Sequence, residues 1–186
     1  GDVVHEGLRN LEYRGYDSAG VATVTPDGID VVKHEGEIDV LCDAVDRSSV
    51  RGSTGIGHTR WSTHGPPTDA NAHPHTDCTG QVAVVHNGII DNYAELKSEL
   101  SAHEFTSETD TEVVPHLLEE FLSAGYTPEE AFRRTIDRLS GSYAIAAVFE
   151  GSDTVFGTRS GSPLVLGRDD DAYYLASDVP AFLEYT

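Results

Sequence analysis

Apolar side chains recur along this chain with two different periods, and each period predicts a different kind of element. Spacings of three and four residues, as in Val4, Leu8 and Leu11, are typical of amphipathic helices. Short apolar runs bounded by glycine, aspartate or serine are typical of strands. We therefore expect helices over residues 3–11, 37–47, 92–100, 110–124 and 128–139. We expect strands over residues 20–24, 29–35, 54–61, 81–86, 142–149, 153–159, 162–168 and 172–177.

Local signals indicate where several of these elements begin or turn. Pro-Asp-Gly at residues 26–28 separates two short strand-like runs, which predicts a β-hairpin. Residues 109–112 and 127–130 both match the capping box S/T-x-x-E, and the second carries proline at the first helical position. Asp91 is placed to cap the helix that follows it.

The order of these elements favours the α+β class. Helix, strands, helices and strands follow one another with hairpin-like connections, and regular strand–helix–strand alternation is not seen. This order predicts two antiparallel sheets packed together and covered by layers of helices. The last four strands are predicted to form a meander. With no internal repeat and no low-complexity linker, residues 1–186 are expected to form one domain.

Charge is the strongest signal in the composition. Lysine and arginine together number 12 against 32 acidic residues, which gives a formal net charge of −20. A magnitude of ~2–8 is usual for a small soluble domain. Such a field repels phosphate backbones and anionic membranes, so neither nucleic acid nor a membrane is expected as a partner. Because self-repulsion at this charge needs screening, we expect adaptation to a high-salt cytoplasm.

The remaining bulk features agree with a cytoplasmic protein. No apolar run approaches the roughly 18 residues that a membrane span needs. The first ten residues lack the basic and apolar regions of a secretory signal. Two cysteines, Cys42 and Cys78, form neither a disulfide framework nor a CxxC pair.

The segment from residue 57 to residue 88 concentrates groups that hydrogen-bond, orient or titrate. It contains five of the nine histidines and the only tryptophan. Between its two strand-like ends lies a polar stretch with two adjacent prolines and no periodicity. A long stretch of this kind in a compact domain is usually functional or disordered.

Two charged residues are candidates for holding an amino acid. Arg60 ends an apolar, glycine-rich run, and its guanidinium can hold a carboxylate through two parallel hydrogen bonds. Asp110 is the natural partner for an ammonium group. The alternatives are an ordinary ion-paired arginine and a first-turn acid that stabilises a helix N-terminus.

Asn87 and Gly88 lie between two apolar runs and have two interpretations. An Asn-Gly pair in this position is the strongest short signal for a hairpin turn. The functional alternative is an oxyanion hole, made of the Asn87 side-chain amide and the backbone N–H of Gly88. Local sequence alone favours the turn.

The histidines also suggest a metal site, but their pattern argues against one. The five histidines in the segment lack the i, i+4 spacing of helical ligands, and Pro74 separates the closest pair. A metal-dependent hydrolase built on them remains a third functional alternative, and we expect no metal and no cofactor. Cys78 is a weak candidate nucleophile, because its polar turn does not depress the pKa of a thiol and nothing in the sequence places a base beside it.

Six blocks spread along the chain resemble one known family. They are LEYRGYDSAG at 11–20, HTRWSTHG at 58–65, NAHPH at 71–75, VVHNGIIDNY at 85–93, SETDTE at 107–112 and RSGSPLVLG at 159–167. In this order and spacing they are similar to the glutaminase domain of the glutamine–fructose-6-phosphate aminotransferases, which are class II glutamine amidotransferases. The resemblance implies the four-layer αββα fold of N-terminal-nucleophile (Ntn) hydrolases. It also implies hydrolysis of L-glutamine to glutamate and ammonia.

The resemblance further implies a role for each matching residue. Those that would bind glutamine are Arg60, Thr63 and His64 at its carboxylate end, Asp110 at its α-ammonium, and Trp61 and His73 in a flap that closes over it. Asn87 and Gly88 would form the oxyanion hole, and Arg14 would support the surroundings of the nucleophile.

One element of the family is not in this sequence. The family's nucleophile is an N-terminal cysteine whose own α-amino group acts as the base, whereas residue 1 is Gly1. We expect a chain truncated at both ends, with that cysteine and two sugar-phosphate isomerase domains belonging to a parent protein that forms homo-oligomers through those domains. The alternative is a non-catalytic, glutamine-binding regulatory domain that lacks the nucleophile.

Overall fold

A computed structural model of the chain describes residues 2–15, 17–39, 41, 52–61 and 65–186. In chain order the elements are α1 (Asp2–Asn10), η1 (Glu12–Arg14), β1 (Ser18–Thr25), β2 (Gly28–Glu35), β3 (Thr54–Arg60), β4 (His75–Thr76), β5 (Val82–Ile90), α3 (Tyr93–Glu99), η2 (Asp110–Glu112), α4 (Val113–Ser123), α5 (Pro128–Ile136), β6 (Gly141–Phe149), β7 (Phe156–Ser160), β8 (Val165–Arg168), β9 (Tyr173–Ala176) and η3 (Val179–Ala181).

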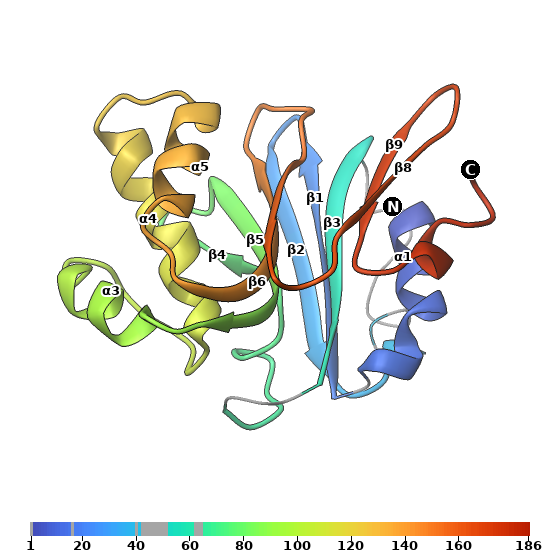
Figure 1. Cartoon of the computed structure of the whole chain (residues 1–186), viewed down its shortest axis with the longest axis horizontal. Helices are drawn as coiled ribbons and strands as arrows, with labels where there is room; N and C mark the ends of the chain where they lie inside the picture. The colour runs from blue at the N-terminus through green and yellow to red at the C-terminus, as the bar shows by residue number, and fades with distance from the viewer. Residues whose placement is uncertain (1, 16, 40, 42–51, 62–64) are drawn as a thin grey trace.

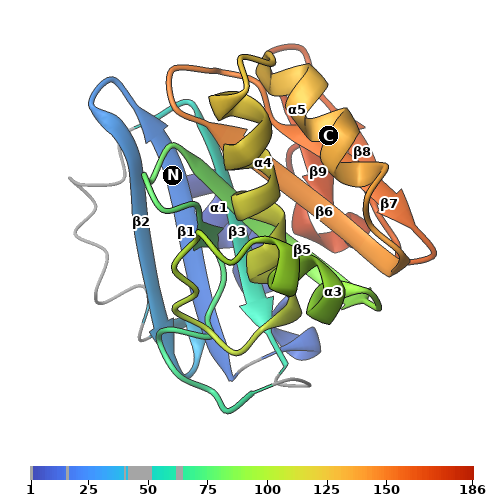
Figure 2. The same ribbon diagram turned by 90° about the vertical axis from the view of Figure 1, so that its left-hand side faces the viewer.

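The strands form antiparallel sheets. The first has the order β2-β1-β3, and the second has the order β4-β5-β6-β7. Strands β8 and β9 form a separate two-stranded pair. Helices α3, α4 and α5 lie on the outer side of the four-stranded sheet, and α1 lies beyond the three-stranded sheet (Figure 1). Helix α4 runs across the face of β5 and β6 (Figure 2). The expected antiparallel α+β architecture is confirmed.

Buried apolar side chains form three separate layers. One joins α1 to the three-stranded sheet and includes Leu8 and Val21. Another joins the four-stranded sheet to its helices and includes Leu117, Phe132 and Ile145. Between the two sheets lies a third layer of smaller side chains, to which Ala22, Ile56, Ala83, Val85 and Val148 belong. This inner layer holds the two sheets face to face.

The local signals succeeded where residues close in sequence satisfy them. The predicted hairpin forms between β1 and β2, with Thr25 opposite Gly28. The second capping box is also confirmed, because the Thr127 hydroxyl accepts from the backbone N–H of Glu130, and the Glu130 carboxylate accepts in return from that of Thr127. The helix expected over 37–47 lies mostly outside the described residues.

Three local predictions were wrong. Asp91 does not cap α3: the cap position is Asn92, whose side chain bonds instead to the backbone of Arg138 and Ser140. Thr109 makes no cap bond to η2, and its hydroxyl pairs with a histidine. The last four strands do not form one meander, because β6–β7 and β8–β9 belong to separate sheets.

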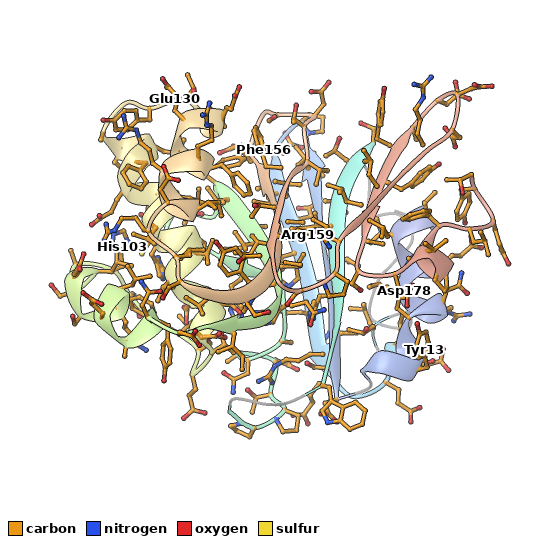
Figure 3. All side chains as sticks on the ribbon, viewed as in Figure 1. Tyr13, His103, Glu130, Phe156, Arg159 and Asp178 are labelled. Carbon is orange, nitrogen blue, oxygen red and sulfur yellow. The ribbon has the colours of Figure 1, made fainter. Side chains whose placement is uncertain are left out.

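The first helix and the end of the described chain are held together. The Tyr13 hydroxyl donates to Asp178 Oδ2 at 2.9 Å, and both residues lie on the α1 side of the molecule (Figure 3). A Cβ placed on Gly7 would lie 2.9 Å from the backbone oxygen of Ala181, so α1 approaches η3 closely. Among the described residues, no helix combines the length and apolar character required to span a bilayer.

Candidate functional site

Arg60 is a buried cation at the end of β3. Its side chain is only 5% exposed, and it donates weakly to two backbone carbonyls of the following loop, from Nη1 to Pro66 O at 3.4 Å and from Nη2 to Gly65 O at 3.5 Å. Burial lowers the pKa of Arg60, whereas the nearby carboxylates of Asp17 and Asp110 raise it. The guanidinium is thus placed between two acids at the edge of the three-stranded sheet.

Asp110 supplies the opposite charge from the other side of the sheet pair. It is the first residue of η2 and is 6% exposed. Its Oδ2 accepts from the backbone N–H of Ile90 at 2.8 Å, and its Oδ1 lies 3.9 Å from His86 Nδ1. These contacts fix the carboxylate against the end of β5.

Asn87 and Gly88 lie inside β5, and the hairpin interpretation of this pair was wrong. They stand opposite Ala144 and Tyr143 of β6, and the ladder continues past them to Ile90. Gly88 has φ +128°, and a Cβ there would lie 2.0 Å from the backbone oxygen of Ser142. Both residues are exposed although the strand before them is buried. The side-chain amide of Asn87 and the backbone of Gly88, with its positive φ, are therefore both accessible to solvent.

Buried histidines surround this region. The rings of His58 and His73 stack with centroids 4.3 Å apart, and His75 meets His73 edge-on at 4.8 Å. His86 Nδ1 pairs with Thr111 Oγ1 at 2.8 Å, and the same hydroxyl lies 3.4 Å from His73 Nε2. Burial, and to a lesser extent the neighbouring positive groups, lowers the pKa of His58 and of His75 to about 3. At neutral pH these rings act as neutral hydrogen-bonding groups.

The loop that follows Arg60 is fastened to both sides of the site. The Asn71 amide donates to Pro66 O at 2.9 Å and accepts from the backbone N–H of Glu108 at the same distance. Lys33 Nζ donates to Ala72 O at 2.8 Å. Trp61, at the start of the loop, is 58% exposed. Such an exposed indole beside a buried arginine fits the flap role expected for Trp61, which stays a prediction.

The structure describes some of the other expected site residues and not others. His73 is 5% exposed and bonds to the backbone N–H of His86 at 3.3 Å, so it lies beneath the loop in the histidine cluster. Thr63 and His64 lie outside the described residues. The backbone of Arg14 ends η1, and the next residue, Gly15, would place a Cβ 2.8 Å from the carbonyl carbon of Arg60. Arg14 therefore belongs to a segment next to Arg60, and its supporting role stays a prediction. We refer to Arg60 and Asp110 together as the clamp.

Comparison with known proteins identifies the family. The sequence model of the glutamine amidotransferase domain matches residues 58–184. The chain belongs to the glutamine amidotransferase family. The resemblance seen in the sequence motifs is thereby confirmed.

Individual relatives of this glutamine amidotransferase chain are full-length enzymes. The glutamine–fructose-6-phosphate aminotransferase (isomerizing) of Halobacterium salinarum is 57% identical over 187 residues, which cover 100% of this chain and 31% of that protein. The enzymes of the same name from Sulfurisphaera tokodaii and Thermococcus kodakarensis are 50% and 52% identical, again over 100% of this chain and 32% and 31% of theirs. The chain thus spans about a third of the length of these curated relatives.

A solved structure resembles the fold of this amidotransferase domain. It is the glutamine phosphoribosylpyrophosphate amidotransferase of B. subtilis, with a TM-score of 0.83 and 28% sequence identity, covering 97% of this chain and 40% of that one. The similarity extends over both sheets and their covering helices, because nearly all of the chain is aligned.

The sequence analysis missed contacts that the fold creates around Arg60 and Cys78. One involves Asp17, since its carboxylate raises the pKa of Arg60 more than the carboxylate of Asp110 does. Another involves Cys78, because two histidine nitrogens lie 3.6 Å from its Sγ although no base was expected there. Partial burial raises the pKa of the Cys78 thiol, and the Glu119 carboxylate raises it further. Cys78 is therefore not an activated nucleophile.

Proposed function

We propose that this chain is the glutaminase domain of a glutamine–fructose-6-phosphate aminotransferase (isomerizing). It hydrolyses L-glutamine to glutamate and ammonia, and the complete protein uses the ammonia to convert fructose 6-phosphate to glucosamine 6-phosphate. The names of its relatives at 50–57% identity over the whole chain support this assignment. Within the α+β class we assign the fold to the four-layer αββα sandwich of Ntn hydrolases, which agrees with the three buried layers.

The observation that carries the proposal is a pair of buried opposite charges beside an open strand segment. Arg60 ends β3 of one sheet, whereas Asp110 begins η2 and is hydrogen-bonded to β5 of the other sheet; both are nearly inaccessible. Free α-amino acids carry a carboxylate and an ammonium one carbon apart, so a buried cation and a buried anion together recognise them. In this proposal Arg60 binds the α-carboxylate of glutamine, and Asp110 binds its α-ammonium.

The reacting amide is then directed to Asn87 and Gly88. As the nucleophile adds to the amide carbon, negative charge develops on the amide oxygen, and the Asn87 side-chain amide and the Gly88 N–H donate to it. Hydrogen bonds that strengthen as this charge develops lower the barrier rather than the ground state. The exposure of both residues in β5 leaves room for a substrate.

The nucleophile in this proposal is an N-terminal cysteine that precedes Gly1 in the complete protein. Its α-amine, with an ordinary pKa of ~7.7–8.0, takes the thiol proton and passes it to the departing ammonia. The thioester that forms is cleaved by water, which releases glutamate and restores the thiol. Arg14 supports this region, and Trp61, Thr63, His64 and His73 help to close the site.

We further propose that the complete protein carries two sugar-phosphate isomerase domains after this one. It forms homo-oligomers through them and works in the cytoplasm. The share of the relatives that this chain spans, about a third, is consistent with those further domains.

The proposal is tested by glutamate release from L-glutamine in molar KCl with the complete natural protein. Arg60→Lys keeps the charge but loses the two-pronged geometry, so the KM for glutamine should rise by about tenfold to a hundredfold. Asn87→Ala should instead lower kcat by about a hundredfold or more. Arg9→Lys is the control, because Arg9 is exposed and its guanidinium pairs with Asp39 at 3.1 Å.

The regulatory alternative makes a different prediction in the same experiment. A non-catalytic domain binds glutamine in calorimetry, and Arg60→Lys weakens that binding, but no glutamate forms. Replacing the proposed N-terminal cysteine by alanine separates the two: it abolishes glutamate release from an enzyme and changes nothing in a sensor. An Arg60→Lys variant with the KM and affinity of the natural protein would refute the clamp in both cases.

A further inference from the structure

A second cluster of chemically active side chains lies in the helical layer and shares no residue with the proposed glutamine site. It consists of Cys78, His103, His116 and Glu119, whose ligand atoms all lie within 4.8 Å of one another. His103 lies beside α4 on the helix-covered side of the molecule (Figure 3). Cys78 is exposed, His116 is buried, and the other two are intermediate.

The distances in this cluster match those between ligands of a tetrahedral metal ion. Cys78 Sγ lies 3.6 Å from His103 Nδ1 and 3.6 Å from His116 Nδ1. Glu119 Oε2 lies 3.0 Å from His103 Nδ1 and 3.5 Å from His116 Nδ1. With zinc–sulfur bonds of about 2.3 Å and zinc–nitrogen bonds of about 2.0 Å, tetrahedral ligands are separated by about 3.5 Å. The four side chains therefore need little rearrangement to hold one ion.

The orientation of both histidines supports the same conclusion. Each directs Nδ1 toward the cluster and Nε2 toward a carboxylate outside it. His116 Nε2 lies 3.8 Å from Glu112 Oε1, and His103 Nε2 lies 3.5 Å from Glu120 Oε1. Metal-binding histidines characteristically donate their second ring N–H to a carboxylate, which fixes the tautomer and leaves the other nitrogen free to coordinate. Both Nε2 atoms therefore have a carboxylate oxygen within 4 Å that can accept this N–H when Nδ1 coordinates an ion.

The backbone positions the four groups from three separate segments. His116 and Glu119 are one turn apart on α4, so both face the same side of the helix. Cys78 lies in the turn between β4 and β5, where Asp77 Oδ1 accepts from the N–H of Val82 at 2.8 Å. The N–H of Cys78 donates to Glu119 Oε2 at 3.0 Å, which fastens that turn to the helix. A cavity of ≈ 140 Å³ lies beside the cluster and is lined in part by Asp77 and Glu119, and Cys78 itself is exposed to solvent.

We propose that Cys78, His103, His116 and Glu119 form a zinc site. One thiolate, two imidazoles and one carboxylate are the donor set that zinc takes in tetrahedral coordination. Four protein ligands complete the shell, so the ion has a structural role and no open position for catalysis. Binding releases the thiol proton, because the thiolate is the form that coordinates, while each neutral imidazole keeps its single ring proton on Nε2 and coordinates through Nδ1. The ion would connect the β4–β5 turn, the segment after α3 and helix α4.

The test uses the complete natural protein, stripped with a chelator and then titrated with cobalt(II) as a spectroscopic probe for zinc. We expect tetrahedral visible bands and a thiolate-to-cobalt absorption in the ultraviolet, saturating at one ion per chain. Cys78→Ser should remove the thiolate absorption, whereas Cys42→Ser should retain it. His103→Ala should reduce the bound metal, whereas His34→Ala, at an exposed histidine paired with Asp69, should not.

Zinc content and unfolding temperature provide the second measurement. Zinc should raise the Tm of the natural protein and of Cys42→Ser, but not that of Cys78→Ser or His103→Ala. Because Cys78 is exposed and His103 is partly exposed, Cys78→Ser and His103→Ala are expected to fold; buried His116 is left unchanged. The proposal is overturned if Cys78→Ser shows the same cobalt spectrum and zinc content as the natural protein. Neither readout requires glutaminase activity, so the outcome is independent of the proposed function.

Discussion

Replacing Gly88 by alanine is expected to destabilise the protein strongly, although the change adds a single methyl group. The residue has φ +128°, which side-chain-bearing residues rarely adopt. The new Cβ would lie 2.0 Å from Ser142 O and 2.8 Å from Tyr143 Cα, and both are backbone atoms of the neighbouring strand β6. Backbone cannot move aside as a flexible side chain can, so β5 and β6 must separate locally.

The magnitude follows from two contributions. Forcing an L-residue into positive φ costs about 1–2 kcal/mol. Separating the strands breaks at least two ladder hydrogen bonds, worth about 1 kcal/mol each. The unfolding free energy should therefore fall by about 3–4 kcal/mol. For a domain of this size, that change lowers Tm by about 6–16 °C.

Gly80 provides the matched control. It also has positive φ, +73°, but a Cβ there would meet nothing within 4 Å. Gly80→Ala should therefore show only the conformational cost of about 1–2 kcal/mol. Urea unfolding followed by circular dichroism at one fixed KCl concentration measures both variants, since urea is uncharged and leaves screening unchanged. If the two variants differ by less than about 0.5 kcal/mol, the close contact between β5 and β6 is not a constraint and the reasoning fails.

Three further predictions concern charge, pH and capping. The Tm should rise by several degrees between dilute and molar KCl, because screening relieves the repulsion of a net charge of −20; a Tm that stays flat would contradict this. The unfolding free energy should fall by about 1 kcal/mol between pH 6.5 and 5.5 for each buried histidine such as His75. The unfolded ring takes up a proton in that window, whereas the folded ring, with its pKa lowered to about 3 mainly by burial, does not. Urea unfolding at each pH gives the unfolding free energy, and its plot against pH should be less steep for His75→Asn than for the natural protein. An equally steep plot would refute the lowered pKa of His75. Thr127→Ala should cost about 1 kcal/mol by removing the N-cap of α5, as measured by urea unfolding against the exposed Thr154→Ala as control; equal costs would show that the cap contributes nothing.

Patterns that depend on neighbouring residues predicted much of this fold. The hairpin at residues 26–28, the helix that begins after Thr127 and the strand before Asn87 were all found from local spacing and turn chemistry. The burial of Arg60 was also anticipated, because the apolar, glycine-rich run before it does not suit a solvated face, whereas the binding of an amino acid by Arg60 and Asp110 stays a prediction.

Predictions failed where a distant partner decides the outcome. The same Asn-Gly sequence suits a turn or a strand, and only the pairing of β5 with β6 decides in favour of the strand. Thr109 matches a capping box, but His75, 34 residues away, takes its hydroxyl. The cluster around Cys78 was missed for the same reason, since its histidines lie 25 and 38 residues along the chain. Only the one-turn spacing of His116 and Glu119 was a local signal for it.

The layer of small buried side chains between the two sheets limits which substitutions this protein can accept during evolution. Its buried members are alanine, valine and isoleucine, whereas the layer beneath the helices contains leucine, phenylalanine and tyrosine. An added carbon beneath a helix can be absorbed by a small tilt of that helix. Between the sheets, the same carbon would wedge apart the sheet that ends in Arg60 and the sheet whose strand β5 holds Asp110 through Ile90. Side-chain volume should therefore drift freely among natural variants in the outer layers and hardly at all at Ala22 and Ala83, far from any contact with substrate.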